Sequence, residues 1–196
     1  MPAAHAQVCY LERAYFQRAG ISTEALYGLF DIEEHGQIVM SHQTALREQI
    51  LKAQERFEAA VTGVEPHSLE TEPVCGEWPV RVIAWHLADW IDEMLAAAQA
   101  SLDGGLVKGH PITDFDGFNQ AHVAKGENAS WAESAARLQQ AVERATAFAN
   151  GLDDAQLELP AVIPWGGEGT AARVLAGIPW HHGVHTEDVE QWRNAS

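Results

Sequence analysis

Three histidines fall within five residues in the C-terminal stretch 178–192, IPWHHGVHTEDVEQW, and an acidic run follows them. His181 and His185 are four residues apart, so both would project from one face of a helix, about one turn apart. That spacing lets two imidazoles reach a single metal ion. His182 and His185 are three residues apart, which is also workable. The periodicity of the surrounding apolar residues does not choose between the two pairs.

A metal site normally needs a third protein ligand, and His86 is the candidate from elsewhere in the chain. It lies in the segment AWHLADW, on the edge of an apolar stripe between Ile83 and Trp90. An imidazole flanked by tryptophans on an inward face is poorly solvated, and burying it without a partner is costly. Two histidines on one helix and one on another would form a three-histidine site with the open position that metal catalysis requires. The alternative is that these are hydrogen-bonded core histidines or exposed ones.

Two acidic residues follow candidate ligands at a spacing of three: Asp89 follows His86, and Asp188 follows His185. Either carboxylate could orient a ligand imidazole or serve as a general base. A solvated acidic face is the commoner explanation for both. Tryptophan near a bundle interior is more often core packing than substrate contact. With that alternative open, the candidates for a pocket wall are Asn119, Trp85, Trp90 and Trp180.

Four segments with helical periodicity would have to position these residues: 42–62, 79–99, 130–149 and 170–192. In 79–99, for example, the apolar stripe is Val80, Ile83, Leu87, Trp90 and Met94. Four such helices predict an all-α fold, a four-helix bundle. The link over 101–129 is long and predicts a crossover between the second and third helices, with DFDGFNQAH as a helical turn within it.

Local signals mark the ends of these helices. Ser130 and Glu133 predict a capping box at the start of the third helix, and Asn150-Gly151 predicts its end. Pro179 predicts either a kink or a fresh start within the fourth helix. Residues 1–39 could form helices of their own but lie outside the bundle pattern. We therefore expect an N-terminal helical extension over 1–39 and the bundle over 40–196.

Composition excludes several classes of function. The formal net charge is −16, with 28 acidic and 12 basic residues, so a phosphate backbone or an anionic membrane would be repelled. No apolar run approaches the roughly 20 residues of a membrane helix, and no signal peptide is recognised, so we expect a cytoplasmic protein. Cys9 and Cys75 match no metal or redox spacing and are interpreted as two ordinary thiols.

The segment CGEWPVRVIAWHLADW, followed far downstream by HHGVHTEDVEQWR, resembles the DinB/YfiT-like superfamily of four-helix-bundle metalloproteins. The resemblance covers roughly residues 42–193. It implies that His86 is the ligand of the second helix, and that His181 and His185 form the H-x-x-x-H motif of the last. His182 would then lie next to the ligands and support them without binding the ion. DFDGFNQAH, with Phe118-Asn119, also resembles the branch that includes ClbS-like proteins. The bundle of mycothiol-dependent maleylpyruvate isomerases is similar; we expect this chain to lack their C-terminal domain and, with it, that exact activity.

The resemblance implies a divalent metal cofactor, for which zinc suits neutral imidazoles, with nickel and other ions as alternatives. It also implies a small-molecule substrate and either hydrolysis or transfer of a low-molecular-weight thiol. The sequence does not choose between these two reactions. The competing hypothesis is a non-catalytic bundle that binds a small molecule, or a structural homodimer with a vestigial metal site.

Overall fold

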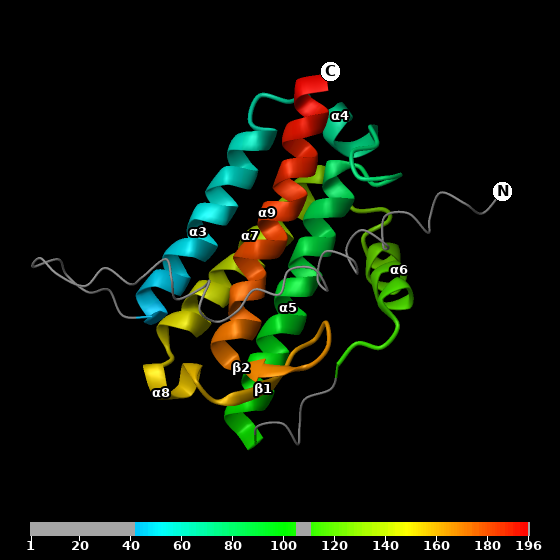
Figure 1. Cartoon of the computed structure of the whole chain (residues 1–196). Helices are drawn as coiled ribbons and strands as arrows, with labels where there is room; N and C mark the ends of the chain where they lie inside the picture. Colours follow the sequence, from blue (N-terminus) through cyan, green and yellow to red (C-terminus); the bar gives the residue numbers. More distant parts are fainter. Residues whose placement is uncertain (1–41, 105–110, 196) are drawn as a thin grey trace, which may run out of the picture.

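Four long helices make up most of the structure, a computed structural model that describes residues 42–104 and 111–195 (Figure 1). Labelled as in the figure, they are α3 (His42–Val61), α5 (Val80–Gly104), α7 (Trp131–Asn150) and α9 (Ala171–Ala195). They match the four predicted segments in order, so the predicted all-α four-helix bundle is confirmed. The predicted extension over residues 1–39 lies outside the described residues.

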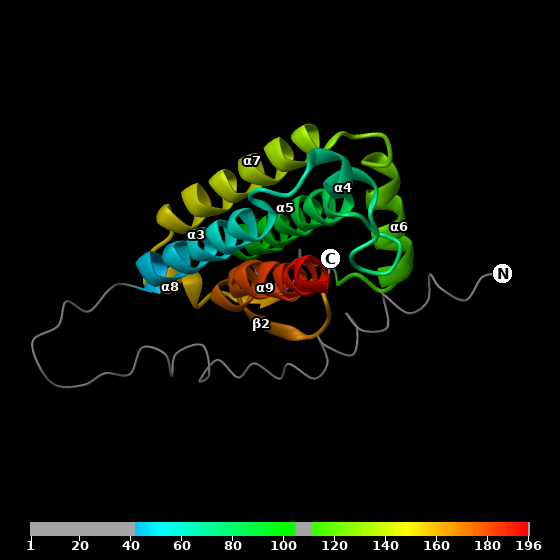
Figure 2. The same ribbon diagram turned by 90° about the horizontal axis from the view of Figure 1, so that it is seen from above.

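The bundle helices form a square in which α3 and α5 each pack against both α7 and α9. α3 and α9 run toward one end of the bundle, and α5 and α7 run toward the other (Figures 1 and 2). The ion pairs Asp89–Arg137 and Asp92–Arg144 advance together along α5 and α7, as parallel neighbours require. Parallel neighbours cannot be joined by a tight turn, so the predicted crossover between the second and third bundle helices is necessary and is present.

The crossover contains a further helix, α6 (Phe115–Lys125), which packs against α5. The Asp114 side chain caps its start by accepting a hydrogen bond from the Gly117 amide at 2.9 Å. Arg81 of α5 donates to the carbonyl oxygens of Gly126 and Glu127 just after α6 ends, at 3.3 and 2.9 Å. The helical turn predicted around DFDGFNQAH is therefore a complete helix, fixed to α5.

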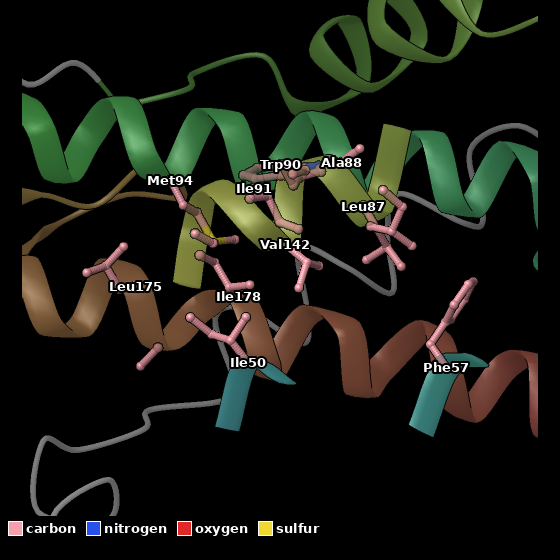
Figure 3. Close-up of a cluster of buried hydrophobic side chains, with 14 of the residues drawn as sticks. Ile50, Phe57, Leu87, Ala88, Trp90, Ile91, Met94, Val142, Leu175 and Ile178 are labelled. Carbon is pink, nitrogen blue, oxygen red and sulfur yellow. The ribbon is translucent and has the colours of Figure 1, made fainter. Parts of the chain in front are cut away.

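The core lies along the axis of the bundle, where apolar side chains of all four helices meet (Figure 3). All five residues of the predicted α5 stripe, from Val80 to Met94, are buried. Ile50 and Phe57 of α3 and Ile178 of α9 face them across the axis. Fully burying side chains of this size stabilises the fold by about 1.5–3 kcal/mol each. The four-and-three spacing of apolar residues therefore explains the packing directly.

The helix ends follow local chemistry. Ser130 and Glu133 form the predicted capping box: Ser130 Oγ accepts from the Glu133 amide at 3.2 Å, and Glu133 Oε2 accepts from the Ser130 amide at 2.8 Å. The hydrogen bonds that the Glu133 carboxylate accepts from the Ser130 amide and the Ser130 hydroxyl lower the pKa of Glu133. Gly151 caps the other end of α7, as predicted. α9 continues through Pro179 without a fresh start, and Ile178, directly before the proline, is buried in the core.

Short elements complete the connections. α4 (Pro66–Thr71) precedes α5, and α8 (Asp154–Leu157) follows α7. The IPWGGEG stretch forms the turn of an antiparallel hairpin of β1 (Pro160–Val162) and β2 (Glu168–Thr170), which leads directly into α9. Gly166 and Gly167 have positive φ angles of 111° and 87°, which this turn requires. Within residues 42–104 and 111–195, none of the helices has the length and apolar character needed to cross a membrane.

Candidate metal centre

Three buried imidazoles converge between α5 and α9. His86 comes from α5, and His181 and His185 come from α9. Each offers one ring nitrogen, and these three nitrogens lie within 4.8 Å of one another. The structure thus brings together the three histidines that the family resemblance implies, and it separates His182 from them.

Local structure explains this convergence. His86 lies between Ile83 and Trp90 on the buried face of α5, and α5 packs directly against α9. His181 and His185 are one turn apart on the face of α9 that meets α5. The three rings meet edge to face, with centroids 5.0 Å apart for His86–His181, 5.2 Å for His86–His185 and 4.8 Å for His181–His185. Edge-to-face rings can direct their nitrogens at a common point.

The donor set fits a divalent cation. Zinc bonded to nitrogens at about 2.0–2.1 Å in tetrahedral geometry would hold them about 3.3 Å apart, so small side-chain movements would close the site. The histidines are 0%, 2% and 1% exposed, in the order His86, His181, His185. Neutral imidazole is the form that binds metal. Three ligands leave a fourth position open.

Asp188 supports His185 from the following turn of α9. Its Oδ2 lies 3.2 Å from His185 Nδ1, and its side chain is 33% exposed. A carboxylate at one ring nitrogen fixes the orientation of the imidazole and directs the other nitrogen to the metal. Asp188 therefore lies where an orienting residue would be needed.

Asp89, the other acidic candidate, has different partners. Its Oδ1 accepts a hydrogen bond from Arg137 of α7, and its Oδ2 lies 2.7 Å from His122 Nδ1 of α6. The Asp89 side chain is only 2% exposed. Arg137 also places its guanidinium over the Trp85 ring, 4.7 Å from the centroid. Asp89 joins α5 to α7 through Arg137 and to α6 through His122, so the geometry favours a structural role for Asp89 over the orientation of His86.

His182 points away from the three histidines, toward α3. Its Nε2 is 3.1 Å from Gln54 Oε1, and its ring meets Phe57 edge to face. Burial, opposed by a hydrogen bond at the Ile178 backbone, lowers the pKa of His182 to about 4. His182 is therefore a neutral, hydrogen-bonded core residue.

Two of the predicted pocket residues, Trp90 and Asn119, pack around the imidazoles. Trp90 is fully buried, with its ring centroid 5.6 Å from that of His181 and 6.3 Å from that of His86. Its Nε1 donates to Asn119 Oδ1 of α6 at 3.1 Å. Trp180 is half-buried, directly before His181. Trp90 and Asn119 are thus packing residues that hold α6 beside the site.

The family profile of the DinB superfamily matches residues 49–189, which include all three histidines. The chain belongs to the DinB superfamily. A similar solved structure is YfiT from Bacillus subtilis, described as a probable metal-dependent hydrolase with an unusual four-helix bundle topology. It is 22% identical, with a TM-score of 0.63, and the match covers 82% of this chain and 90% of that chain. At this identity the likeness shows the fold. Among curated proteins, none matches.

Two residues beside the site of this DinB-superfamily chain were missed by the sequence interpretation. Trp78 places its ring 5.0 Å from that of His86. Cys75 places its sulfur within 4.8 Å of a ring nitrogen of His185 and a carboxylate oxygen of Asp188. Both belong to the tight turn before α5. The sequence signal for both was their place within the CGEWP segment, which opens the family-like stretch.

Proposed function

We propose that this chain is a metal-dependent hydrolase of a small electrophilic substrate, with His86, His181 and His185 as the metal ligands and zinc as the ion. The observation that carries the proposal is the convergence of three buried imidazoles from α5 and α9. The description of YfiT, a similar structure, as a probable metal-dependent hydrolase supports the same class of reaction.

A divalent cation held by three neutral ligands keeps its full charge, and so acidifies water at its open position and polarises a bound carbonyl or phosphoryl group. The chain's own residues provide the setting. Trp90 and Trp78 pack against the imidazoles and restrict the positions that their rings can take. The Asp188 carboxylate accepts a hydrogen bond from His185 Nδ1–H, which keeps the opposite ring nitrogen unprotonated and able to bind the metal.

The test is hydrolysis of a panel of small esters, amides and phosphoesters by the zinc-loaded protein. We expect turnover in water alone, reduced at least about 100-fold in His181→Ala because the metal is lost. His182→Ala, one residue away, should keep most of the activity if its fold is intact. Equal activity of the wild-type and His181→Ala proteins would contradict the proposal.

The same panel separates hydrolysis from thiol transfer. Addition of a low-molecular-weight thiol such as cysteine should leave the hydrolysis rate unchanged, because water is the proposed nucleophile. If turnover appears only with the thiol and the product carries its sulfur, the reaction is thiol transfer instead, and the hydrolase proposal is wrong.

A further inference from the structure

The turn before α5 places a thiol beside the candidate metal centre. Cys75 and Trp78 form an antiparallel bridge: the Trp78 amide donates to the Cys75 carbonyl at 3.0 Å, and the Cys75 amide donates to the Trp78 carbonyl at 3.2 Å. Gly76 takes the positive φ of 60° that this turn requires. Bridged residues direct their side chains to the same side. Trp78 accordingly reaches His86, while Cys75 reaches His185.

Cys75 is one of three different metal donors that meet at this point. Its Sγ, one ring nitrogen of His185 and one carboxylate oxygen of Asp188 all lie within 4.8 Å of one another. Because Asp188 Oδ2 is 3.2 Å from His185 Nδ1, an ion shared by these two residues would bind Nδ1. That arrangement leaves Nε2 of His185 as the nitrogen for the three-histidine site. The two groups of donors therefore use opposite sides of one imidazole.

We propose that Cys75, His185 and Asp188 form a second cation site, which shares His185 with the three-histidine site and takes a borderline or soft divalent cation such as Zn²⁺ or Cd²⁺. Sulfur, nitrogen and oxygen donors together suit such ions, and a thiolate selects against hard ones. The charges also agree. A thiolate and a carboxylate neutralise a divalent cation bound here. When both sites are filled, His185 gives up its Nδ1 proton to solvent and bridges the two ions as an imidazolate, whose negative charge limits their repulsion.

The site formed by Cys75, His185 and Asp188 is accessible from solvent. Asp188 is one-third exposed and Cys75 is half-buried, so an ion can enter from solvent without passing the three-histidine site. The overall charge of −16 favours the approach of cations. The second site shares His185, and the carboxylate that orients it, with the proposed hydrolytic centre, but its existence does not rest on the proposed hydrolysis.

Titration with Co²⁺ under reducing conditions tests the proposal, because thiolate ligation of cobalt gives a charge-transfer band in the near ultraviolet. The titration uses the full chain with Cys9→Ala, which leaves Cys75 as the single thiol. A second variant adds His86→Ala and His181→Ala and so removes two of the three donors of the first site. We expect the band in both proteins, and its loss when Cys75→Ser is added to either.

Two results would overturn the second site. No band at any Co²⁺ concentration would show that Cys75 binds no cation. A band that disappears with His86 and His181 would show that Cys75 is instead a fourth ligand of the first ion. Circular dichroism establishes that each variant is folded, and His86→Asn with His181→Asn repeats the test if the alanine pair loses helicity. Asp188→Asn should weaken the Co²⁺ affinity that the band reports by about tenfold.

Discussion

Asp188 Oδ2 lies 3.2 Å from His185 Nδ1, one turn further along α9. This contact ties an imidazole of the buried three-histidine group to a carboxylate that reaches the surface. It is the arrangement by which a carboxylate sets the tautomer and the orientation of a metal-binding histidine. The metal affinity of this chain should therefore depend on a residue that is not itself one of the three ligands.

Asp188→Asn should lower the zinc affinity of the three-histidine site by roughly 10–100-fold, because the amide orients His185 less strongly than the carboxylate does. Competition with a chromogenic chelator measures this affinity, in a Cys75→Ala background that removes the neighbouring thiol. Glu187→Gln is the matched control, since it makes the same change of charge at a side chain that faces Arg56. An equal loss in both variants would indicate that net charge alone is responsible.

The ion pair of Asp89 should matter for stability and not for metal binding. Asp89→Asn leaves the Arg137 guanidinium without its buried partner, and we expect a loss of about 3 kcal/mol in the free energy of unfolding. Asp92→Asn, on the more exposed neighbouring turn, should cost no more than about 1 kcal/mol. Urea unfolding measures both. Metal loss from a fully stable Asp89→Asn protein would instead indicate that Asp89 acts at the metal centre.

Two glycines of α9 should respond to alanine in opposite directions. A Cβ at Gly177 would lie 2.4 Å from Trp165 Cη2 and 3.2 Å from Met94 Sδ, whereas a Cβ at Gly183 would have no neighbour within 4 Å. Gly183→Ala should raise the free energy of unfolding by up to about 1 kcal/mol, through helix propensity alone. Gly177→Ala should lower it by about 1–3 kcal/mol through overpacking. Thermal unfolding compares them, and a rise for Gly177→Ala would show that Trp165 moves aside freely.

The bundle was predictable because the sequence signals for its helices lie within short stretches of the chain. The regular spacing of Ile83, Leu87 and Trp90 identifies the buried face of α5 without knowledge of the other helices. The Ser130–Glu133 capping box likewise lies within four residues. The β1–β2 hairpin was not predicted, since three-residue strands carry no periodicity and the glycines between them indicate only a turn.

The candidate site was only partly predictable, because its geometry depends on contacts distant in sequence. Periodicity did not choose between His181 and His182; the family resemblance did, and the structure directs His182 to Gln54, 128 residues earlier. The partners of Asp89, on α6 and α7, are 33 and 48 residues away. Cys75 meets α9 only because the turn before α5 folds against it. These contacts join residues that are far apart in the sequence, so residue spacing alone does not predict them.

The most direct test of the three-histidine site is the metal content of His181→Ala beside His182→Ala, both in a Cys75→Ala background. Each protein is loaded with Zn²⁺, freed of unbound ion, checked for helicity and analysed by mass spectrometry. The geometry predicts about one zinc per chain in the Cys75→Ala parent and in His182→Ala, and almost none in His181→Ala. Zinc retained by folded His181→Ala, or lost equally from both folded variants, would contradict the assignment of His86, His181 and His185 as the metal ligands.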